Sequence, residues 1–144
     1  MVANVLGDYA VQIVKNAAHL AQFLMERGVK LITNGTSNHL MLVDCIKSWG
    51  IAGAEVETTL DKVNITLNKN MIPDDPRKPM DPSGVRLGTP AITTRGMKEQ
   101  EMEILGDFML KAIAARNNES ALVSLRGEVT EFCRRFPVPG IEIA

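Results

Sequence analysis

Cysteine, histidine and aromatic residues are scarce in this chain of 144 residues, which has two cysteines, two histidines and 4% aromatic residues. Cys45 and Cys133 form no CxxC pair and stand among apolar residues. They therefore suit inert, buried thiols in a reducing compartment better than a disulfide or a metal site. The two histidines, His19 and His39, have no metal-ligand spacing, so no metal site is predicted.

An excess of charge and long hydrophobic runs are also absent. The net charge is −1, from 16 basic and 17 acidic residues, so no overall field favours nucleic acid or an anionic membrane as a partner. No apolar run is long enough to span a bilayer, and Gly7 and Asp8 interrupt the stretch where a secretion signal needs an apolar core. We expect a soluble cytoplasmic protein with one compact domain over residues 1–144.

Hydrophobic residues at helical spacing recur along the chain. The first helix is expected from Ala10, where the apolar stripe begins, to Gly28, a common helix stop, with His19 on its solvated side. Further helices are expected over residues 52–63, 97–116 and 122–136.

Short β-prone runs alternate with these helices. They cover Val29–Thr33, His39–Asp44, residues 64–70 and a run that begins at Ser83. The turn-rich NGTSN separates the first two runs, which predicts an adjacent antiparallel pair. Helices and strands together predict an α+β fold, in which helices cover a small, mostly antiparallel sheet.

The segment Met71–Gly84 differs from the rest because it has prolines at positions 73, 76, 79 and 82. Such a segment cannot form a helix or donate regularly to a sheet. Long loops inside compact domains are usually functional or disordered, and we expect an ordered, functional loop.

Arg86 is the residue that points most directly to chemistry. It stands between Val85 and Leu87 in a strand, so its side chain is expected on the face opposite theirs, toward a cleft, solvent or a partner. A guanidinium binds a carboxylate through two parallel hydrogen bonds, which lysine cannot do. Spacing alone also allows an ordinary surface arginine paired with a nearby acid. No nucleophile–base pair, GxSxG, P-loop or GxGxxG motif is present, which disfavours an independent hydrolase.

The stretch SGVRLGTPAITTRGM resembles the signature in the C-terminal part of serine hydroxymethyltransferases. VKNAAHLAQFLMERGVKLITNGTSNHLMLVD resembles the entry to that family's small domain, ITLNKNMIPDDPRKP the segment before the signature, and FPVPG its end. Several motifs in the right order are far more specific than one short pattern. The resemblance covers essentially the whole chain.

The family consists of pyridoxal phosphate enzymes of the aspartate aminotransferase fold type. They convert serine and tetrahydrofolate reversibly into glycine and 5,10-methylenetetrahydrofolate. The resemblance implies the C-terminal small domain of such an enzyme, whose partners are the large domain of the same enzyme and further copies in a homodimer or homotetramer. The family's cofactor lysine and phosphate cradle belong to that large domain. Lys69 is therefore not expected to bind the cofactor, and the isolated chain is expected to be inactive.

By this resemblance, Arg86 binds the carboxylate of serine or glycine, and Asn70 and the stretch Lys78, Pro79 and Met80 contact the folate. The family often has Ser-Pro-Phe where this chain has Lys-Pro-Met, and Gly-Gly-Thr-Asp-Asn-His where it has NGTSNH. Thr36, Asn38 and His39 are interpreted as a structural turn in preference to direct ligands. These departures leave open an alternative, a stand-alone binding or interaction module that has the same fold and no catalysis.

Overall fold

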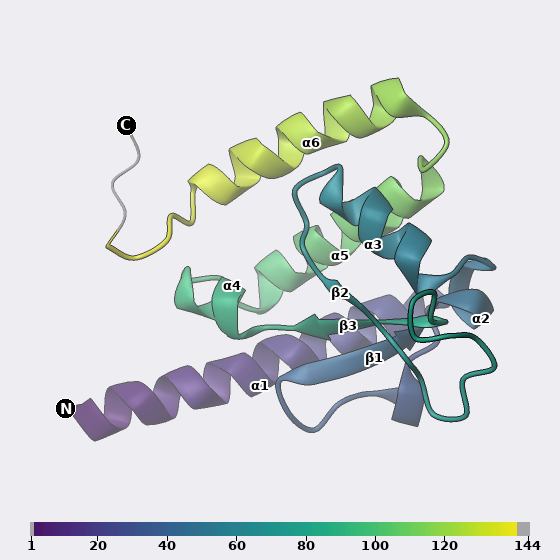
Figure 1. The fold of residues 1–144 in the computed structure, drawn as a ribbon. Coiled ribbons are helices and arrows are strands. Elements are labelled where there is room, and N and C mark those ends of the chain that lie inside the picture. Colours follow the sequence, from purple (N-terminus) through teal and green to yellow (C-terminus); the bar gives the residue numbers. More distant parts are fainter. Residues whose placement is uncertain (1, 141–144) are drawn as a thin grey trace.

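Strand β3 (Gly84–Gly88) is the central strand of a three-stranded antiparallel sheet in the computed structural model, which describes residues 2–140. Strand β1 (Leu40–Asp44) pairs with one edge of β3, and β2 (Asn68–Asn70) pairs with the other (Figure 1). The strand order is therefore β1-β3-β2, with the last strand of the sequence in the middle. The predicted α+β class is confirmed.

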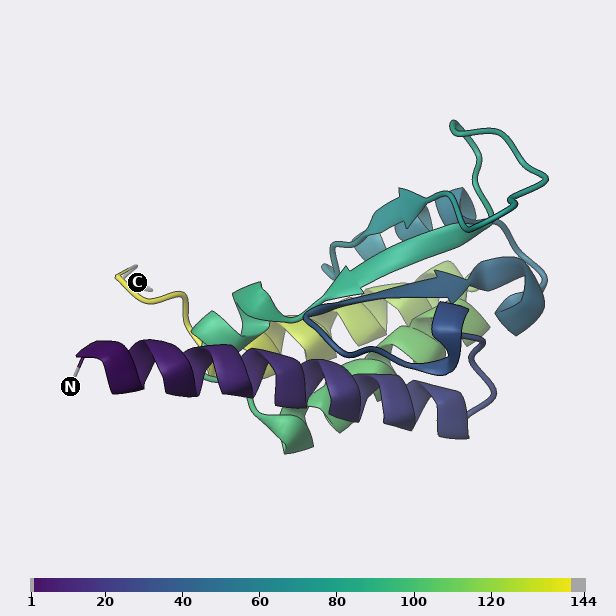
Figure 2. The same cartoon turned by 90° about the horizontal axis from the view of Figure 1, so that it is seen from below.

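Helices cover one face of this sheet. The longer ones are α1 (Val2–Glu26), α3 (Gly53–Asp61), α5 (Glu99–Ala114) and α6 (Glu119–Arg134). Helices α1 and α5 lie on one side of the sheet, while the loop over residues 71–83 extends on the other side (Figure 2). Helix α3 contacts β2, β3 and α5, and α6 packs on α5. The opposite face of β3 is left without a helix over it.

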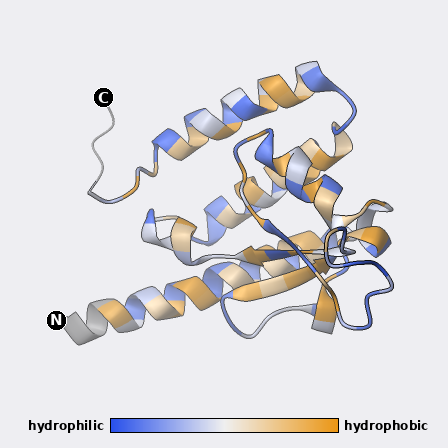
Figure 3. Cartoon of the chain, viewed as in Figure 1, coloured by the Kyte–Doolittle hydropathy of each residue, from blue (hydrophilic) through white to orange (hydrophobic). Residues whose placement is uncertain are grey.

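The hydrophobic core lies between the sheet and the helices. Its residues are fully or almost fully buried and include Leu24 of α1, Val43 and Val85 of the sheet, and Met102 and Ile113 of α5. Figure 3 shows hydrophobic residues concentrated on β1 and on parts of the helices, whereas the loop over residues 71–83 is largely hydrophilic. The burial alternates along β1 and β3 as a sheet with one covered face requires.

Two short helices were not predicted from the sequence. Helix α2 (Cys45–Trp49) directly follows β1, and the Asp44 side chain caps it by accepting a hydrogen bond from the Lys47 amide at 3.0 Å. Helix α4 (Pro90–Thr94) follows β3 and begins with a proline, which suits the first helical position because its missing N–H would have no partner there. An apolar stripe of helical spacing does not develop over five residues, so periodicity could not reveal either helix.

The predicted strand over Val29–Thr33 is wrong. Leu31 makes only an isolated antiparallel bridge to Val43, and residues Ile32–Asn34 form a 3₁₀ turn, η1. Thr33 and Asn34 have φ angles of 64° and 55°, in the left-handed region, where an extended strand cannot continue. This segment was expected to pair antiparallel with β1, and it does so only at the Leu31–Val43 bridge.

Two predicted boundaries also moved. Helix α1 begins at Val2 and not at Ala10. The earlier start was not predicted, because exposed positions such as Leu6 and Val11 form no buried apolar stripe. The strand expected over residues 64–70 is reduced to β2, since only its last three residues pair with β3. Within the described residues, no helix is both long and apolar enough to cross a membrane.

The two thiols have different environments. Cys45 is fully buried at the start of α2, whereas Cys133 of α6 is only half-buried, so the expectation of a buried thiol is wrong for Cys133. Burial, together with the neighbouring Asp44 charge, raises the pKa of the Cys45 thiol to about 12, although a hydrogen bond with the Val85 backbone opposes this shift. Thiolate is the reactive form, so Cys45 is almost entirely unreactive near neutral pH.

We therefore expect iodoacetamide to alkylate Cys133 in the native protein at pH 8 while Cys45 remains unmodified. Cys45 should react only after unfolding in denaturant, when burial no longer protects it. Mass spectrometry of peptides taken at timed intervals measures both rates. Equal native rates for the two thiols would contradict the burial of Cys45.

Candidate functional site

Arg86 lies at the middle of β3, on the face that no helix covers. Its neighbours Val85 and Leu87 are buried against the core, and Arg86 itself is exposed. The residues directly opposite it are Leu42 on β1 and Asn68 on β2. The strand alternation therefore presents the guanidinium outward, as the sequence predicted.

The guanidinium has no hydrogen-bond or ion-pair partner within residues 2–140. Its two cross-strand neighbours are a leucine and an asparagine, so neither supplies a negative charge. Arg77 and Arg95 differ from Arg86 in this respect, because Arg77 pairs with Asp81 and Arg95 donates to backbone carbonyls. The alternative of an ordinary arginine paired with a nearby acid thus finds no support among the described side chains.

An open hollow of about 350 Å³ lies beside Arg86. Its lining comes from η1 and the turn that follows it, from β1, from β2 and from β3: Ile32, Thr33, Gly35, Thr36, Ser37, Asn38, Leu40, Met41, Leu42, Asn70 and Arg86. Arg86 is the only charged residue in this lining. The hollow therefore combines one cation with hydroxyl, amide and apolar groups, which suits a small anionic and polar ligand.

The turn over residues 35–39 forms one wall of this hollow. The Thr36 hydroxyl accepts a hydrogen bond from the Asn38 amide at 3.2 Å, and the Asn38 side-chain oxygen accepts one from the Leu40 amide at 2.8 Å. Both side chains thus stabilise the backbone of the turn, in the manner of Asx and Ser/Thr turns. His39 is exposed and donates nothing to the turn through its ring, while its carbonyl accepts from the Thr89 amide.

Asn70 shares the hollow with Arg86. It ends β2 directly opposite Gly84, two positions from the Arg86–Asn68 pair, so it lies on the same face of the sheet. Its side-chain amide donates to the Met71 carbonyl at 2.8 Å. This bond holds the side chain at the end of the strand, with its amide oxygen unpaired within residues 2–140.

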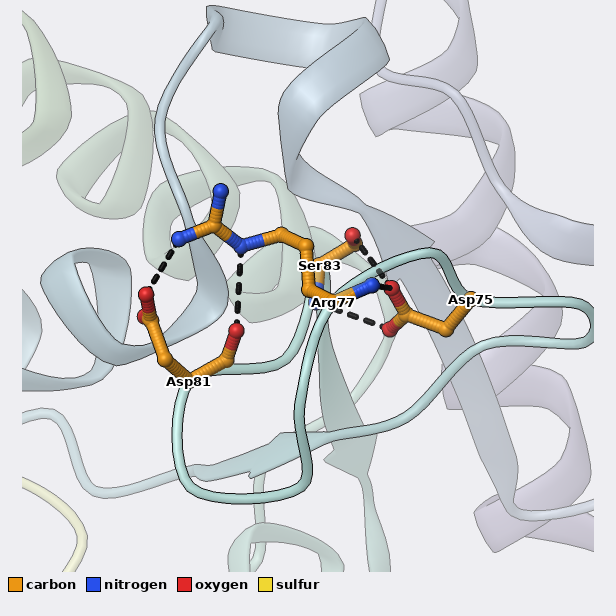
Figure 4. A network of polar contacts seen from close by, with 4 residues as sticks. All are labelled: Asp75, Arg77, Asp81 and Ser83. Carbon is orange, nitrogen blue, oxygen red and sulfur yellow. Dashed lines mark hydrogen bonds and ion pairs between the residues drawn. The ribbon is translucent and has the colours of Figure 1, made fainter.

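The proline loop is ordered by one carboxylate. Asp75 accepts hydrogen bonds from the Ser83 amide at 2.9 Å, the Ser83 hydroxyl at 2.7 Å and the Arg77 amide at 2.9 Å (Figure 4). A longer bond from the Ile72 amide, at 3.3 Å, completes the set. Asp75 therefore joins the two ends of the loop just before β3 begins.

A second contact closes the tip of the loop. The Arg77 guanidinium donates to the Asp81 carbonyl at 3.0 Å and also pairs with the Asp81 carboxylate (Figure 4). The four prolines restrict the same segment by fixing their own φ angles. The structure thus agrees with the expectation of an ordered loop.

The charge of Asp75 is favoured in the folded protein. Partial burial acts to raise the pKa of this carboxyl, but the hydrogen bonds from Ser83, Arg77 and Ile72 outweigh it and lower the pKa from 3.8 to about 2. A group with a depressed folded-state pKa stabilises the protein above its unfolded-state pKa, and that contribution is lost as the pH falls. The loop should therefore be fully held above about pH 4 and released as the pH approaches 2.

Replacement of Asp75 by asparagine should release the loop at neutral pH. One acceptor oxygen becomes an amide donor, which cannot accept from Ser83 or Arg77. We expect trypsin to cleave after Arg77 several-fold faster in D75N than in the unsubstituted chain at pH 7.5. The matched control is D74N. Asp74 is the exposed neighbour of Asp75, and asparagine tolerates its left-handed backbone conformation. Equal cleavage rates in the two variants would show that Asp75 does not hold the loop.

Lys78, Pro79 and Met80 are exposed at the far end of this loop. Met80 has 81% of its surface accessible, and none of the three lines the hollow of Arg86 and Asn70. The structure thus brings Arg86 and Asn70 together and leaves the other three predicted folate contacts apart from them.

Sequence reasoning missed several residues of this face. Leu42 and Asn68 are paired directly with Arg86, and Leu40 lies two positions from Leu42. All three therefore lie on the same face of the sheet as Arg86. Alternation within each strand was visible in the sequence. The register that sets Leu42 and Asn68 opposite Arg86 was not, since it depends on how three distant segments pair.

Comparison with known proteins gives a consistent result. The serine hydroxymethyltransferase family matches residues 2–109 of the chain. A protein of Acidobacterium capsulatum named serine hydroxymethyltransferase is 51% identical over 134 residues, which cover 93% of this chain and 31% of that relative. Relatives of the same name from Sorangium cellulosum and Myxococcus xanthus are each 50% identical, over 94% and 90% of this chain and 32% and 31% of their own lengths. The chain therefore spans about a third of the length of these curated relatives.

Proposed function

This chain belongs to the serine hydroxymethyltransferase family, and we propose that it is the part of such an enzyme that holds the carboxylate of the amino-acid substrate. The proposed reaction interconverts serine and tetrahydrofolate with glycine and 5,10-methylenetetrahydrofolate. The observation that carries this proposal is Arg86, an exposed guanidinium without an acidic partner within residues 2–140, placed beside a hollow on the uncovered face of the sheet.

The role of Arg86 follows from its chemistry. A planar guanidinium can donate two parallel hydrogen bonds to one carboxylate, which fixes both the position and the orientation of the amino acid. Strand β3 is held on both edges by β1 and β2, so the backbone that presents Arg86 is rigid. A fixed orientation aligns the bond that breaks with the reactive group and removes much of the entropic cost of the reaction.

Asn70 and the proline loop are proposed to contact the folate. Asn70 lines the same hollow as Arg86 and offers an amide oxygen, which suits the donor groups of a pteridine ring. Lys78, Pro79 and Met80 stand apart on the exposed end of the loop, where they could meet a ligand only if it extended away from Arg86. Asp75 and Arg77 act as positioning residues, because they hold the loop without facing the hollow.

Pyridoxal phosphate is the proposed cofactor of the complete enzyme, in which it supplies the electron sink for bond cleavage. The described residues do not fit this group, because no lysine lines the hollow beside Arg86. Lys69 lies opposite the buried Val85, and therefore on the other face of the sheet from Arg86. We accordingly propose that the cofactor is held by the large domain of the enzyme, which is the partner that would meet the uncovered face of β3.

The proposed setting is a cytoplasmic homodimer or homotetramer of complete subunits, within which residues 1–144 form one domain. A single buried core that joins α1, the sheet, α3, α5 and α6 supports the single domain. Two cysteines without a disulfide support a reducing compartment.

A chimera tests the proposal against the isolated chain. The matching third of the Acidobacterium capsulatum relative would be replaced by this chain, with which it is 51% identical. We expect the chimera to retain pyridoxal phosphate after desalting and to convert serine to glycine in the presence of tetrahydrofolate. The isolated chain should do neither, since it has no lysine at the hollow.

Two results would contradict this proposal. Turnover by the isolated chain would refute the need for a second domain. A chimera that folds, retains the cofactor and still has no activity would favour the alternative of a stand-alone binding module. Cofactor absorbance and size-exclusion chromatography separate that second result from a failure to fold.

A further inference from the structure

A second hollow, of about 540 Å³, lies on the other side of Arg86. It exists because β2 pairs with β3 only over residues 68–70, so the preceding segment, residues 64–67, diverges from β3 (Figure 1). The gap faces Leu87 and Gly88 at the end of β3 and is closed by parts of α4, α5 and α6.

The lining of this hollow is mainly apolar. Its hydrophobic residues come from strands and helices far apart in the sequence and include Leu40, Leu87, Ile92, Leu105, Met109 and Val129. Two arginines border it, Arg86 and Arg95. Arg95 is already engaged, because it donates to the Phe136 carbonyl at 2.5 Å and the Cys133 carbonyl at 2.9 Å. Arg86 is therefore the cation of this lining that remains available to a ligand.

We propose that this hollow is a binding site for small amphipathic carboxylates, whose apolar body fills the hollow while the carboxylate binds Arg86. The volume lies within the range of small-molecule sites, which are typically apolar with a few polar groups that orient the ligand. The charge of Arg86 favours an anion, and its planar fork can bind a carboxylate through two parallel hydrogen bonds. This inference goes beyond the proposed function and needs no other part of the polypeptide.

The shared arginine gives the second site a consequence for the first. Arg86 and Leu40 line both hollows, so the same arginine borders each of them. A guanidinium carries one positive charge, and two carboxylates brought to it from opposite sides repel each other. A carboxylate bound from the apolar side therefore weakens the binding of an amino-acid carboxylate from the polar side, so the two ligands compete.

Cys133 provides a direct readout, because it is half-buried and lines the apolar hollow. The probe is 4-phenylbutyrate, and its neutral counterpart is 4-phenylbutan-1-ol. We expect the carboxylate to slow the alkylation of Cys133 by iodoacetamide in a saturable manner, with the alcohol at least about tenfold weaker, because it lacks the charge-assisted bond. The methyl resonance of Met109, which lines the same hollow, should shift with the same concentration dependence.

Two arginine substitutions locate the carboxylate. R86Q should weaken 4-phenylbutyrate about tenfold and leave the alcohol unchanged, whereas R126Q, at an exposed position of α6, should bind both probes as before. No effect of 4-phenylbutyrate on Cys133 or Met109, equal affinity for the alcohol, or unchanged affinity in R86Q would each overturn the inference. The assay uses this chain without cofactor, so its outcome is independent of whether the chimera turns over serine.

Discussion

Replacement of Arg86 by lysine in the chimera is expected to lower kcat/KM for serine about 100-fold. A lysine keeps the positive charge but cannot donate two parallel hydrogen bonds, and a hydrogen bond to a charged group contributes about 1.5–3 kcal/mol, which is about a 10- to 100-fold effect. Loss of orientation adds to the loss of affinity, because the bond that breaks is no longer aligned. Steady-state kinetics with varied serine measures both parts.

The cofactor should be unaffected by this substitution, since no cofactor lysine lies at the hollow. Retention of pyridoxal phosphate, followed by absorbance after desalting, is therefore expected to match the unsubstituted chimera. The matched control is R126K, in which an exposed arginine of α6 far along the chain receives the same change. Unchanged serine kinetics in R86K would remove Arg86 from the site, while equal losses in R86K and R126K would point to a general effect on folding.

Replacement of Gly53 by alanine should be the most destabilising small change in the fold. Gly53 begins α3, and its amide donates to the Pro82 carbonyl at 2.9 Å, so the helix starts directly against the end of the proline loop. A Cβ at this position would stand 2.0 Å from the Gly84 carbonyl oxygen and 3.1 Å from the Pro82 carbonyl oxygen. Both are backbone atoms, so helix and strand must move apart. We expect a loss of about 3 kcal/mol in the free energy of unfolding.

Urea denaturation of the isolated chain measures this loss as a lower midpoint at an unchanged slope. G127A is the matched control, because a Cβ at Gly127 in α6 would meet no atom within 4 Å. Alanine there should raise the stability by up to about 1 kcal/mol, since glycine is a poor helix former. Equal midpoints for G53A and the unsubstituted chain would show that α3 and β3 do not approach each other this closely.

The close approach at Gly53 also links stability to the site. The Cβ of an alanine at position 53 would strike Gly84, the first residue of β3. Arg86 lies two residues further along that strand. A displaced β3 would carry the guanidinium with it. G53A is therefore expected to reduce serine turnover in the chimera as well, even though Gly53 lines no part of the hollow.

Much of this fold was predictable from local patterns. The stripes in α3, α5 and α6 and the run in β1 bury one face each, and burial is what produces the periodicity that a sequence displays. Residues 6–11 of α1 are exposed, and α2 and α4 are five residues long, so none of these left a readable period. The residues of Val29–Thr33 have strand propensity, but the left-handed backbone at Thr33 overrides it.

The sequence by itself determined the class of the fold, the outward face of Arg86 and the family, because alternation, apolar stripes and motifs are all written locally along the chain. Only the tertiary structure decided that β3 lies between β1 and β2, that Asn70 shares a hollow with Arg86 while Lys78–Met80 lie apart, and that a second, apolar hollow opens beside the same arginine. Each of these depends on the register between strands more than ten residues apart and on where their pairing stops. Register is set by the packing of the whole core, so no segment of the sequence specifies it alone.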